Sequence, residues 1–272
     1  VLLSRIRKSN SIHLHADNRA KLSKFCSILL RLVCTEASAT ALYEYIGDPC
    51  AKELFALSQI FPKASGDAFR EEMSSLRKRC LLEVQAKDAL RCWPKVGELL
   101  ALRIMLSVFP TSDYRHPVLT PANIFFGEML SGFPVRGAQD ASAGVFISCL
   151  QIEAARGAGR LPTEALCFLS GLVTRAAMNG LSTDADRARH SSQAGLVFSR
   201  CPAIRDSADR TIGSVFESGV GAKMPPLMKV GAVESAESVL LSAWKYLKKS
   251  IQQILGSTEL SNVLPELFGP FV

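Results

Sequence analysis

The dipeptide Phe-Pro constrains the fold most, because it recurs and each copy ends an apolar segment of helical periodicity. The copies lie at residues 61–62, 109–110 and 133–134, and they begin 48 and then 24 residues apart. Proline stops a helix because its ring restricts the preceding residue and removes a backbone donor. The spacing predicts two helix-and-loop units and then one, which is typical of HEAT and armadillo repeats with periods of about 40–47 residues.

We therefore predict an all-α chain in which helical pairs form an irregular α-solenoid of the HEAT/armadillo kind, with a closed helical bundle as the alternative. One apolar face of helical period is complete in the segment after Asn18, where it comprises Leu22, Phe25, Cys26, Leu29, Leu30 and Val33. Similar patterns predict further helices near residues 1–9, 37–46, 49–60, 67–86, 94–108, 121–130, 141–155 and 162–178. Polar residues that can cap these helices are Asn18, Asp67, Thr120 and Asp140.

Three parts of the chain differ in pattern. Residues 1–180 form the predicted helical-repeat core, and residues 181–232 are loop-rich and weakly specified. Residues 233–272 contain a basic amphipathic helix over 234–255 and a short terminal helix near 259–268. The chain does not begin with Met, and we expect it to be part of a longer protein.

Residues 109–121 (FPTSDYRHPVLTP) form a predicted corner between two apolar helices. Phe109 is the apolar anchor of the first helix, and Pro110 ends that helix. Thr120 is expected to cap the next helix, with Pro121 as its first residue. The corner would then expose four side chains, those of Asp113, Tyr114, Arg115 and His116.

His116 has two interpretations. Its imidazole could bond to the backbone within the corner, or it could contact a phosphate or a partner protein. The other histidines lie in polar segments, and His13 and His15 have no second pair of metal ligands in the sequence. With no Gly-rich phosphate loop and no convergent nucleophile and base, we predict no enzyme activity, no cofactor and no metal site.

Composition is that of a globular chain, with 48% hydrophobic and 21% charged residues. The eight cysteines form no CxxC pair, which favours buried, reduced thiols over zinc ligands. No apolar segment reaches the ~18–20 residues that a membrane span needs. The net charge of +7 is compatible with a nucleic acid or an acidic protein as partner, and with a merely basic surface.

Basic side chains gather in two segments. Residues 1–24 carry six Lys and Arg residues against Asp17 alone, and a lysine stripe follows the polar face of the helix over 234–255. Each segment is either a solvated surface or a contact to RNA phosphates. With 7% aromatic residues, base stacking is not the expected mode. The candidate RNA-binding or partner-binding residues are Arg5, Arg7, Lys8, Arg115, His116, Lys245, Lys248 and Lys249.

The segment LLALRIMLSVFPTSDYRHPVLTPA (99–122) resembles the nucleolar protein fourteen family, a component of the small-subunit processome. The resemblance continues in LFALSQIFPKASGDAF (54–69) and RIRKSN…NRAKLSKF (5–25), and more loosely in ASAGVFISCLQIE and LPTEALCFLSGL. It covers roughly residues 5–175, and the expected apolar residue after the corner is replaced by Asn123.

The resemblance implies a non-catalytic scaffold of the early pre-ribosome, located in the nucleolus of the nucleus and needed for 18S ribosomal RNA and the small subunit. Implied partners are pre-ribosomal RNA and the small nucleolar RNP particle, nucleolar complex protein four, a ribosomal-RNA pseudouridine methyltransferase and other processome proteins. A transport or cargo adaptor with a helical-repeat groove is the alternative, and it would not retain RNA at physiological salt.

Overall fold

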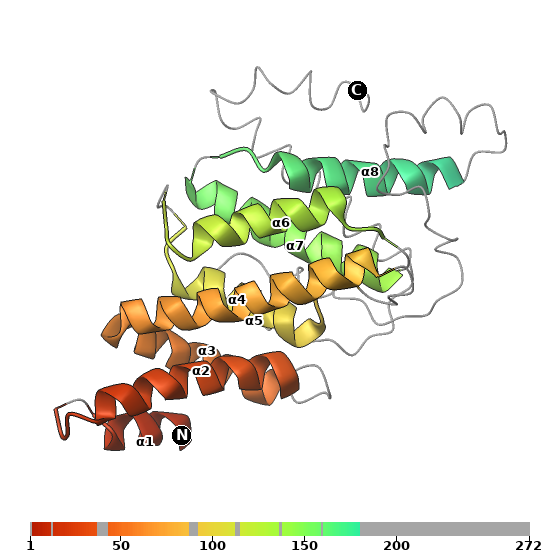
Figure 1. Ribbon diagram of the computed structural model, residues 1–272. Coiled ribbons are helices and arrows are strands. Elements are labelled where there is room, and N and C mark those ends of the chain that lie inside the picture. The colour runs from red at the N-terminus through yellow and green to blue at the C-terminus, as the bar shows by residue number, and fades with distance from the viewer. Residues whose placement is uncertain are drawn as a thin grey trace. The chain divides into compact units, whose positions relative to one another are not determined.

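The computed structural model describes residues 2–11, 13–36, 43–86, 92–111, 115–135, 138–158 and 160–179. Within these ranges every regular element is an α-helix, which confirms the all-α prediction there (Figure 1). The predicted loop-rich segment 181–232 and the basic helix over 234–255 lie outside the described residues. The helices are α1 (Leu2–Ser9), α2 (Asn18–Glu36), α3 (Tyr43–Ile60), α4 (Pro62–Gln85), α5 (Val96–Val108), α6 (Leu119–Gly132), α7 (Ala138–Ala158) and α8 (Thr163–Asn179).

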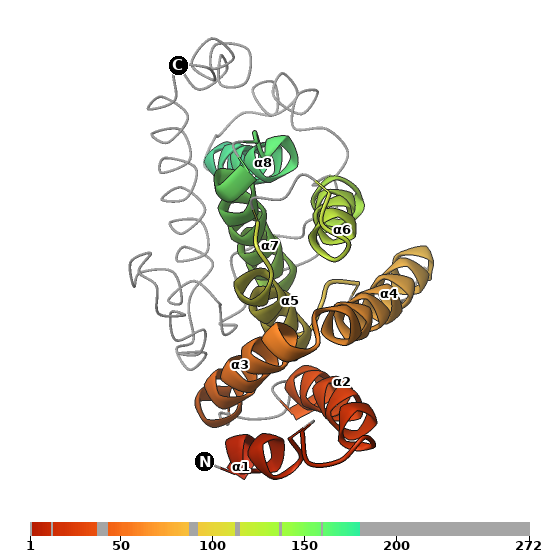
Figure 2. The same ribbon diagram turned by 90° about the vertical axis from the view of Figure 1, so that its left-hand side faces the viewer.

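The described residues fall into two compact units, the first ending at Phe125 and the second beginning at Phe126. In the first unit α2 contacts α3, α4 and α5, and α1 contacts α3 (Figures 1 and 2). In the second unit α7 packs against α8. Because α2 contacts three helices that follow it, packing in the first unit is not limited to successive pairs. The solenoid of successive helical pairs is therefore not confirmed and stays a prediction. The predicted domain limits also stay a prediction.

All three Phe-Pro pairs lie directly after a helix, as the sequence predicts. The helices α3, α5 and α6 end one residue before Phe61, Phe109 and Phe133, respectively. The three phenylalanines are buried, whereas the prolines that follow them are exposed or half-buried. Each pair thus anchors the end of a helix in the core through its ring and stops the helix with the next residue.

The predicted apolar face of α2 is confirmed. Leu22, Cys26, Leu29, Leu30 and Val33 are at most 2% exposed, and Phe25 is half-buried. The predicted cap is displaced by one residue: the Lys21 amide donates to the Asp17 carbonyl, so Asp17 occupies the cap position. The Asn18 amide group instead donates to the Ser11 carbonyl at 2.9 Å and fixes the segment between α1 and α2.

The boundary predicted within α3 is wrong. A helix near 37–46 and a second one from Pro49 were expected, but α3 is continuous from Tyr43 to Ile60 and contains Pro49. A proline inside a helix costs about 3 kcal/mol in an isolated helix. Here the helix buries Cys50, Leu54 and Leu57 and packs against α2, and this burial offsets the missing bond.

Two further helix starts were placed too late. The helix α4 begins at Pro62, five residues before the expected cap Asp67, because Phe61 has non-helical angles and proline is accepted in the first turn. Asp67 instead forms an ion pair with Arg70, one turn along α4. The helix α7 begins at Ala138, so Asp140 lies in its first turn, where a carboxylate is favoured by the helix dipole.

Candidate functional site at the corner after α5

The corner begins where α5 ends. The Phe109 amide still donates to the Met105 carbonyl at 3.1 Å, but its φ of −109° and ψ of 143° are extended. The centroid of its ring lies 5.4 Å from that of the Phe69 ring on α4, in an edge-on contact, and 5.1 Å from that of the His116 ring. Phe109 therefore connects α4, the end of α5 and the segment that leads into α6.

His116 caps α6. Its Nδ1 accepts hydrogen bonds from the amides of Val118 and Leu119, both at 3.2 Å, while its carbonyl accepts from the Thr120 amide at 3.1 Å. These bonds satisfy the backbone amides that lead into α6, which begins at Leu119. The prediction that Thr120 caps the helix and that Pro121 is its first residue is thus two residues late. In the sequence, His116-Pro117 carries the same signal for a helix start as Thr120-Pro121, namely a polar residue followed by proline.

Of the two interpretations of His116, the structure shows the backbone bonding. Nδ1 is the acceptor in both bonds. The ring is half-buried, so the prediction of an exposed histidine holds only in part. Arg115 beside it is exposed as predicted, whereas Asp113 and Tyr114 lie outside the described residues.

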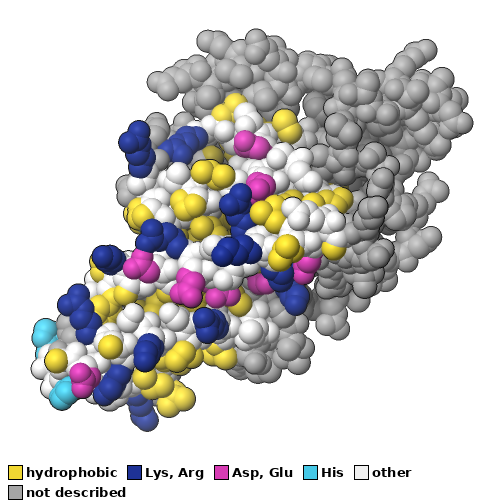
Figure 3. Space-filling model, in the orientation of Figure 1, with side chains coloured by type: hydrophobic (Ala, Val, Ile, Leu, Met, Phe, Trp, Pro, Cys, Tyr) yellow, Lys and Arg dark blue, Asp and Glu magenta, His cyan; other side chains and the backbone are white. Residues whose placement is uncertain are grey.

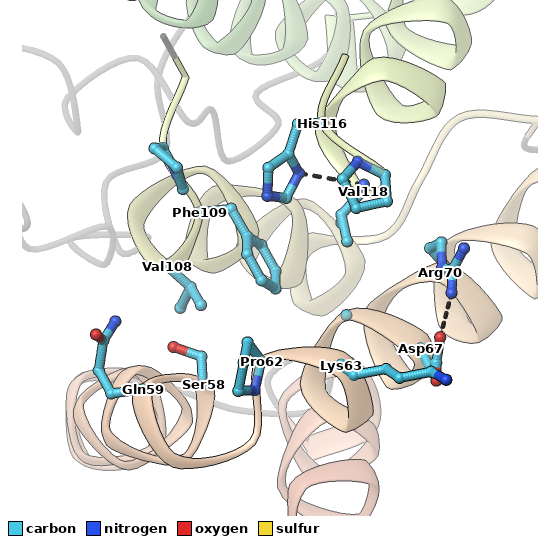
Figure 4. A pocket seen from close by; sticks show the side chains of 13 residues that line it. Ser58, Gln59, Pro62, Lys63, Asp67, Arg70, Val108, Phe109, His116 and Val118 are labelled. Atoms are coloured by element: carbon cyan, nitrogen blue, oxygen red, sulfur yellow. Dashed lines mark hydrogen bonds and ion pairs between the residues drawn. The ribbon is translucent and has the colours of Figure 1, made fainter. Parts of the chain in front are cut away.

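A pocket of about 560 Å³ opens beside this corner (Figure 4). The end of α3, the start of α4, the end of α5 and the residues before α6 line it. Its apolar lining includes Pro62, Val108, Phe109, Pro110 and Val118, and its charged residues are Lys63, Asp67 and Arg70 on α4. The pocket was not foreseen, because it joins two Phe-Pro segments that lie 48 residues apart in the sequence.

The basic candidates of the first helix divide by their contacts. Arg5 and Lys8 are exposed and lie three residues apart on α1, on one side of the helix. Arg7 is half-buried, and its Nε donates to Glu53 Oε2 on α3 at 2.7 Å. Arg7 thus holds α1 against α3, whereas Arg5 and Lys8 face solvent.

Positive charge continues along α2, where Arg19, Lys21, Lys24 and Arg31 are exposed. Figure 3 shows many blue side chains and few magenta ones at the lower end of the visible face, where α1 and α2 lie. The three candidates of the C-terminal stripe, Lys245, Lys248 and Lys249, lie outside the described residues.

The seven cysteines in the described ranges are free thiols. Five of them are buried, as predicted, while Cys34 is half-buried and Cys167 is exposed. Burial raises the pKa of Cys50 to about 11 and, as the largest cause, the pKa of Cys80 to about 12. Both thiols are therefore protonated at neutral pH and are poor nucleophiles.

The described ranges contain neither a metal-binding cluster nor a membrane-spanning helix. No cluster of three or more His, Cys, Asp or Glu side chains there could hold a metal ion. None of the helices there is long and apolar enough to cross a membrane.

The fold and the corner define a helical protein with a basic surface and an open pocket between helix ends. The model of the Nop14-like family matches residues 1–213, and the chain belongs to this family. The match extends beyond residue 175, where the resemblance in the sequence ends, and thus includes part of the segment for which no resemblance was found.

Individual relatives agree with the family match. The chain is 32% identical to Nucleolar protein 14 of Homo sapiens over 186 residues, which are 67% of this chain and 21% of the human protein. It is 30% identical to the Probable nucleolar complex protein 14 of Schizosaccharomyces pombe over 149 residues, which are 55% of this chain and 18% of that protein. The chain thus spans about a fifth of the length of these relatives. Their names confirm the predicted location in the nucleolus.

Proposed function

We propose that this chain is part of a non-catalytic ribosome-biogenesis factor, a scaffold of the small-subunit processome that acts in pre-rRNA processing toward 18S rRNA. The observation that carries the proposal is the family match over residues 1–213, in a chain whose described regular elements are all helices. Packed helices bury one side and offer long outer faces and corners, which suit binding to several neighbours at once.

The proposed contacts are of two kinds. The exposed residues Arg5, Lys8 and Arg115 would neutralise phosphates of pre-ribosomal RNA without discrimination between bases. The lysines of the predicted C-terminal stripe, Lys245, Lys248 and Lys249, would do the same. Apolar and mixed surfaces would bind proteins, among them nucleolar complex protein four, the rRNA pseudouridine methyltransferase and components of the small nucleolar RNP particle. Arg7 supports this surface indirectly, because its ion pair with Glu53 positions α1.

Affinity purification of the full-length protein at moderate and high salt tests the proposal. We expect early small-subunit precursor RNA and processome proteins in the moderate-salt eluate. High salt should remove RNA held through phosphates and leave the directly bound proteins. Transport factors without precursor RNA would instead favour the adaptor alternative.

Charge-reversal variants locate the RNA contacts. Arg5→Glu with Lys8→Glu, and Lys245→Glu with Lys248→Glu and Lys249→Glu, should each reduce retention of precursor RNA. A matched control is Lys78→Glu with Lys95→Glu, two exposed positions outside both basic segments. If the control weakens RNA retention as much as the test variants, the contacts are non-specific and these residues lose their assigned role.

A further inference from the structure

The pocket at the corner has the size of a binding site and is formed by helices that pack against one another. Its volume of about 560 Å³ lies within the range of about 300–1,000 Å³ that is usual for ligand pockets. Its walls are helix ends whose helices pack against one another, since α3 contacts both α4 and α5. Gly66 and Val118 both line the pocket, and a Cβ on Gly66 would lie 3.4 Å from Val118 Cγ2.

Two exposed apolar side chains lie on α3, whose last turn lines the pocket with Ser58 and Gln59. Phe55 and Ile60 are 48% and 40% exposed, although both are large apolar side chains. Phe55 precedes the pocket residue Gln59 by one helical turn, so the two share a face of α3. An exposed apolar surface beside a concave one is typical of a protein-binding site.

The charges of the pocket are mostly positive. Asp67 is paired with Arg70 (Figure 4). Among the described residues Lys63 has no ion-pair partner within 4 Å. Lys63 and Pro62 are also the first residues of α4, and the cap residue Phe61 makes no side-chain hydrogen bond to the amides there. The positive end of the α4 dipole thus adds to the charge of Lys63 and favours carboxylates.

The lining favours a peptide over RNA. Phe109 is only 8% exposed, and the rings of Phe69 and His116 lie within 5.4 Å of its ring. It therefore offers no free face for a base, and stacking on an aromatic face is how single-stranded RNA is usually held in a groove. The valines and prolines of the lining instead suit an aliphatic or aromatic side chain of a protein.

We propose that the corner pocket is a docking site for an acidic peptide segment of a partner protein, which places one apolar side chain in the pocket and its carboxylates beside Lys63 and Arg70. This deepens the proposed scaffold function, because it states the chemistry of one protein partner. It also gives the two Phe-Pro segments a joint role, since Pro62 and Pro110 both line the pocket.

The test uses the purified chain and a displayed library of random peptides of about twelve residues. We expect enrichment of peptides that combine several Asp or Glu residues with one large apolar residue. The enriched peptide, labelled with fluorescein, is then titrated with the chain and its binding followed by anisotropy. Lys63→Glu should weaken binding by about ten-fold or more, since it replaces attraction by repulsion. Gln59→Trp should do the same by filling the pocket.

Lys78→Glu is the control, because Lys78 is also an exposed lysine of α4 but does not line the pocket. It should leave the affinity unchanged within about two-fold. All three positions are exposed, and a thermal melt of each variant confirms that it is folded. Enrichment of basic peptides, no enrichment, or equal binding by Lys63→Glu and the wild type would overturn the proposal.

An oligouridylate of the same length is the competitor. If it displaces the peptide and its own binding is lost in both Lys63→Glu and Gln59→Trp, the pocket is an RNA site and the peptide proposal is wrong. Failure of peptide binding with intact association to the processome would remove only this docking site. Intact peptide binding without precursor RNA or processome proteins would count against the scaffold function instead.

Discussion

The contact between α2 and α5 in the first unit and that between α7 and α8 in the second both depend on a glycine, but different atoms oppose it. A Cβ at Gly97 in α5 would lie 2.4 Å from the Cys34 carbonyl oxygen and 2.6 Å from that of Val33, at the end of α2. A Cβ at Gly144 in α7 would lie 2.1 Å from Cζ of Phe168 in α8. Backbone opposes the first glycine, and the far end of a side chain opposes the second.

The surroundings of the two contacts differ as well. In the first unit α5 is tied to α4 by Arg79, which bonds to Glu83 and Glu98 at 2.6 Å each. In the second unit every residue from Asp140 to Gln151 in α7 is buried. The first unit therefore combines close backbone packing with the ion pairs of Arg79, while the second buries one stretch of α7 on all sides.

The largest effect is expected for Gly97→Ala. Neither opposing carbonyl can move without displacing α2, which also contacts α3 and α4. We expect a loss of about 3 kcal/mol in the free energy of unfolding, the upper end for overpacking. Urea denaturation measures it. Gly132→Ala is the control, because no atom lies within 4 Å of a Cβ there. Equal midpoints for both variants would show that α2 and α5 do not approach closely.

Gly144→Ala should cost about 2 kcal/mol, because the Phe168 ring has to shift within a core where it is 2% exposed. Because a side chain opposes Gly144, whereas backbone opposes Gly97, a second substitution should restore stability only for Gly144→Ala. Phe168→Leu removes the opposing ring atom, so the two changes should be coupled by about 1 kcal/mol in a double-mutant cycle. Additive losses would mean that the ring does not oppose Gly144.

Glu98→Ala tests the polar contacts of the first unit. Glu98 Oε2 accepts from the Lys95 amide at the start of α5 and from Arg79, both at 2.6 Å, and its side chain is 16% exposed. Removing it uncaps α5 and leaves Arg79 with Glu83 alone, so we expect a loss of about 1.5 kcal/mol. Glu71→Ala, at an exposed position of α4, should stay within about 0.5 kcal/mol. A similar midpoint for both variants would remove the bridge from the stabilising contacts.

His116→Ala should cost about 1 kcal/mol, the usual value for an N-cap residue. His116→Asn should recover most of this, because its Oδ1 can accept from the same amides of Val118 and Leu119. Hydrogen exchange at the start of α6 provides the local readout. If Asn and Ala are equally destabilising, the ring contact with Phe109 and not the cap accounts for the effect.

The smallest effect is a dependence on alkaline pH. The pKa of Cys50 is raised from 9.0 to about 11, so between these values the unfolded chain loses a proton that the folded chain keeps. The contribution of Cys50 to the free energy of unfolding is fully present below pH 9 and is lost as the pH rises toward 11. At pH 9.5 the Cys50 contribution to this loss should be under about 1 kcal/mol. The stability of Cys50→Ala, measured in urea, should fall less steeply over this range than that of the wild type, and parallel curves would contradict the assignment.

Prediction from the sequence succeeded where a property is local to one helix. The buried face of α2 and the helix ends before Phe61, Phe109 and Phe133 follow from apolar spacing and local stop signals. It failed at helix starts, because His116, Phe61 and Asp17 precede the helices where Thr120, Asp67 and Asn18 were expected as caps. Alternative caps at a helix start differ in the stability that they contribute by about 1 kcal/mol. Tertiary packing easily overrides a difference of this size.

The sequence by itself determined the helical class of the described residues, the Phe-Pro helix ends and the family, because these depend on periodicity and on near-consecutive residues. Tertiary structure alone decided the pocket and the two glycine contacts. Residues 62 and 110 are far apart in the chain, and the distance of Gly97 from Cys34 depends on how α2 and α5 pack. Periodicity specifies which face of a helix is buried, but not which helix covers it.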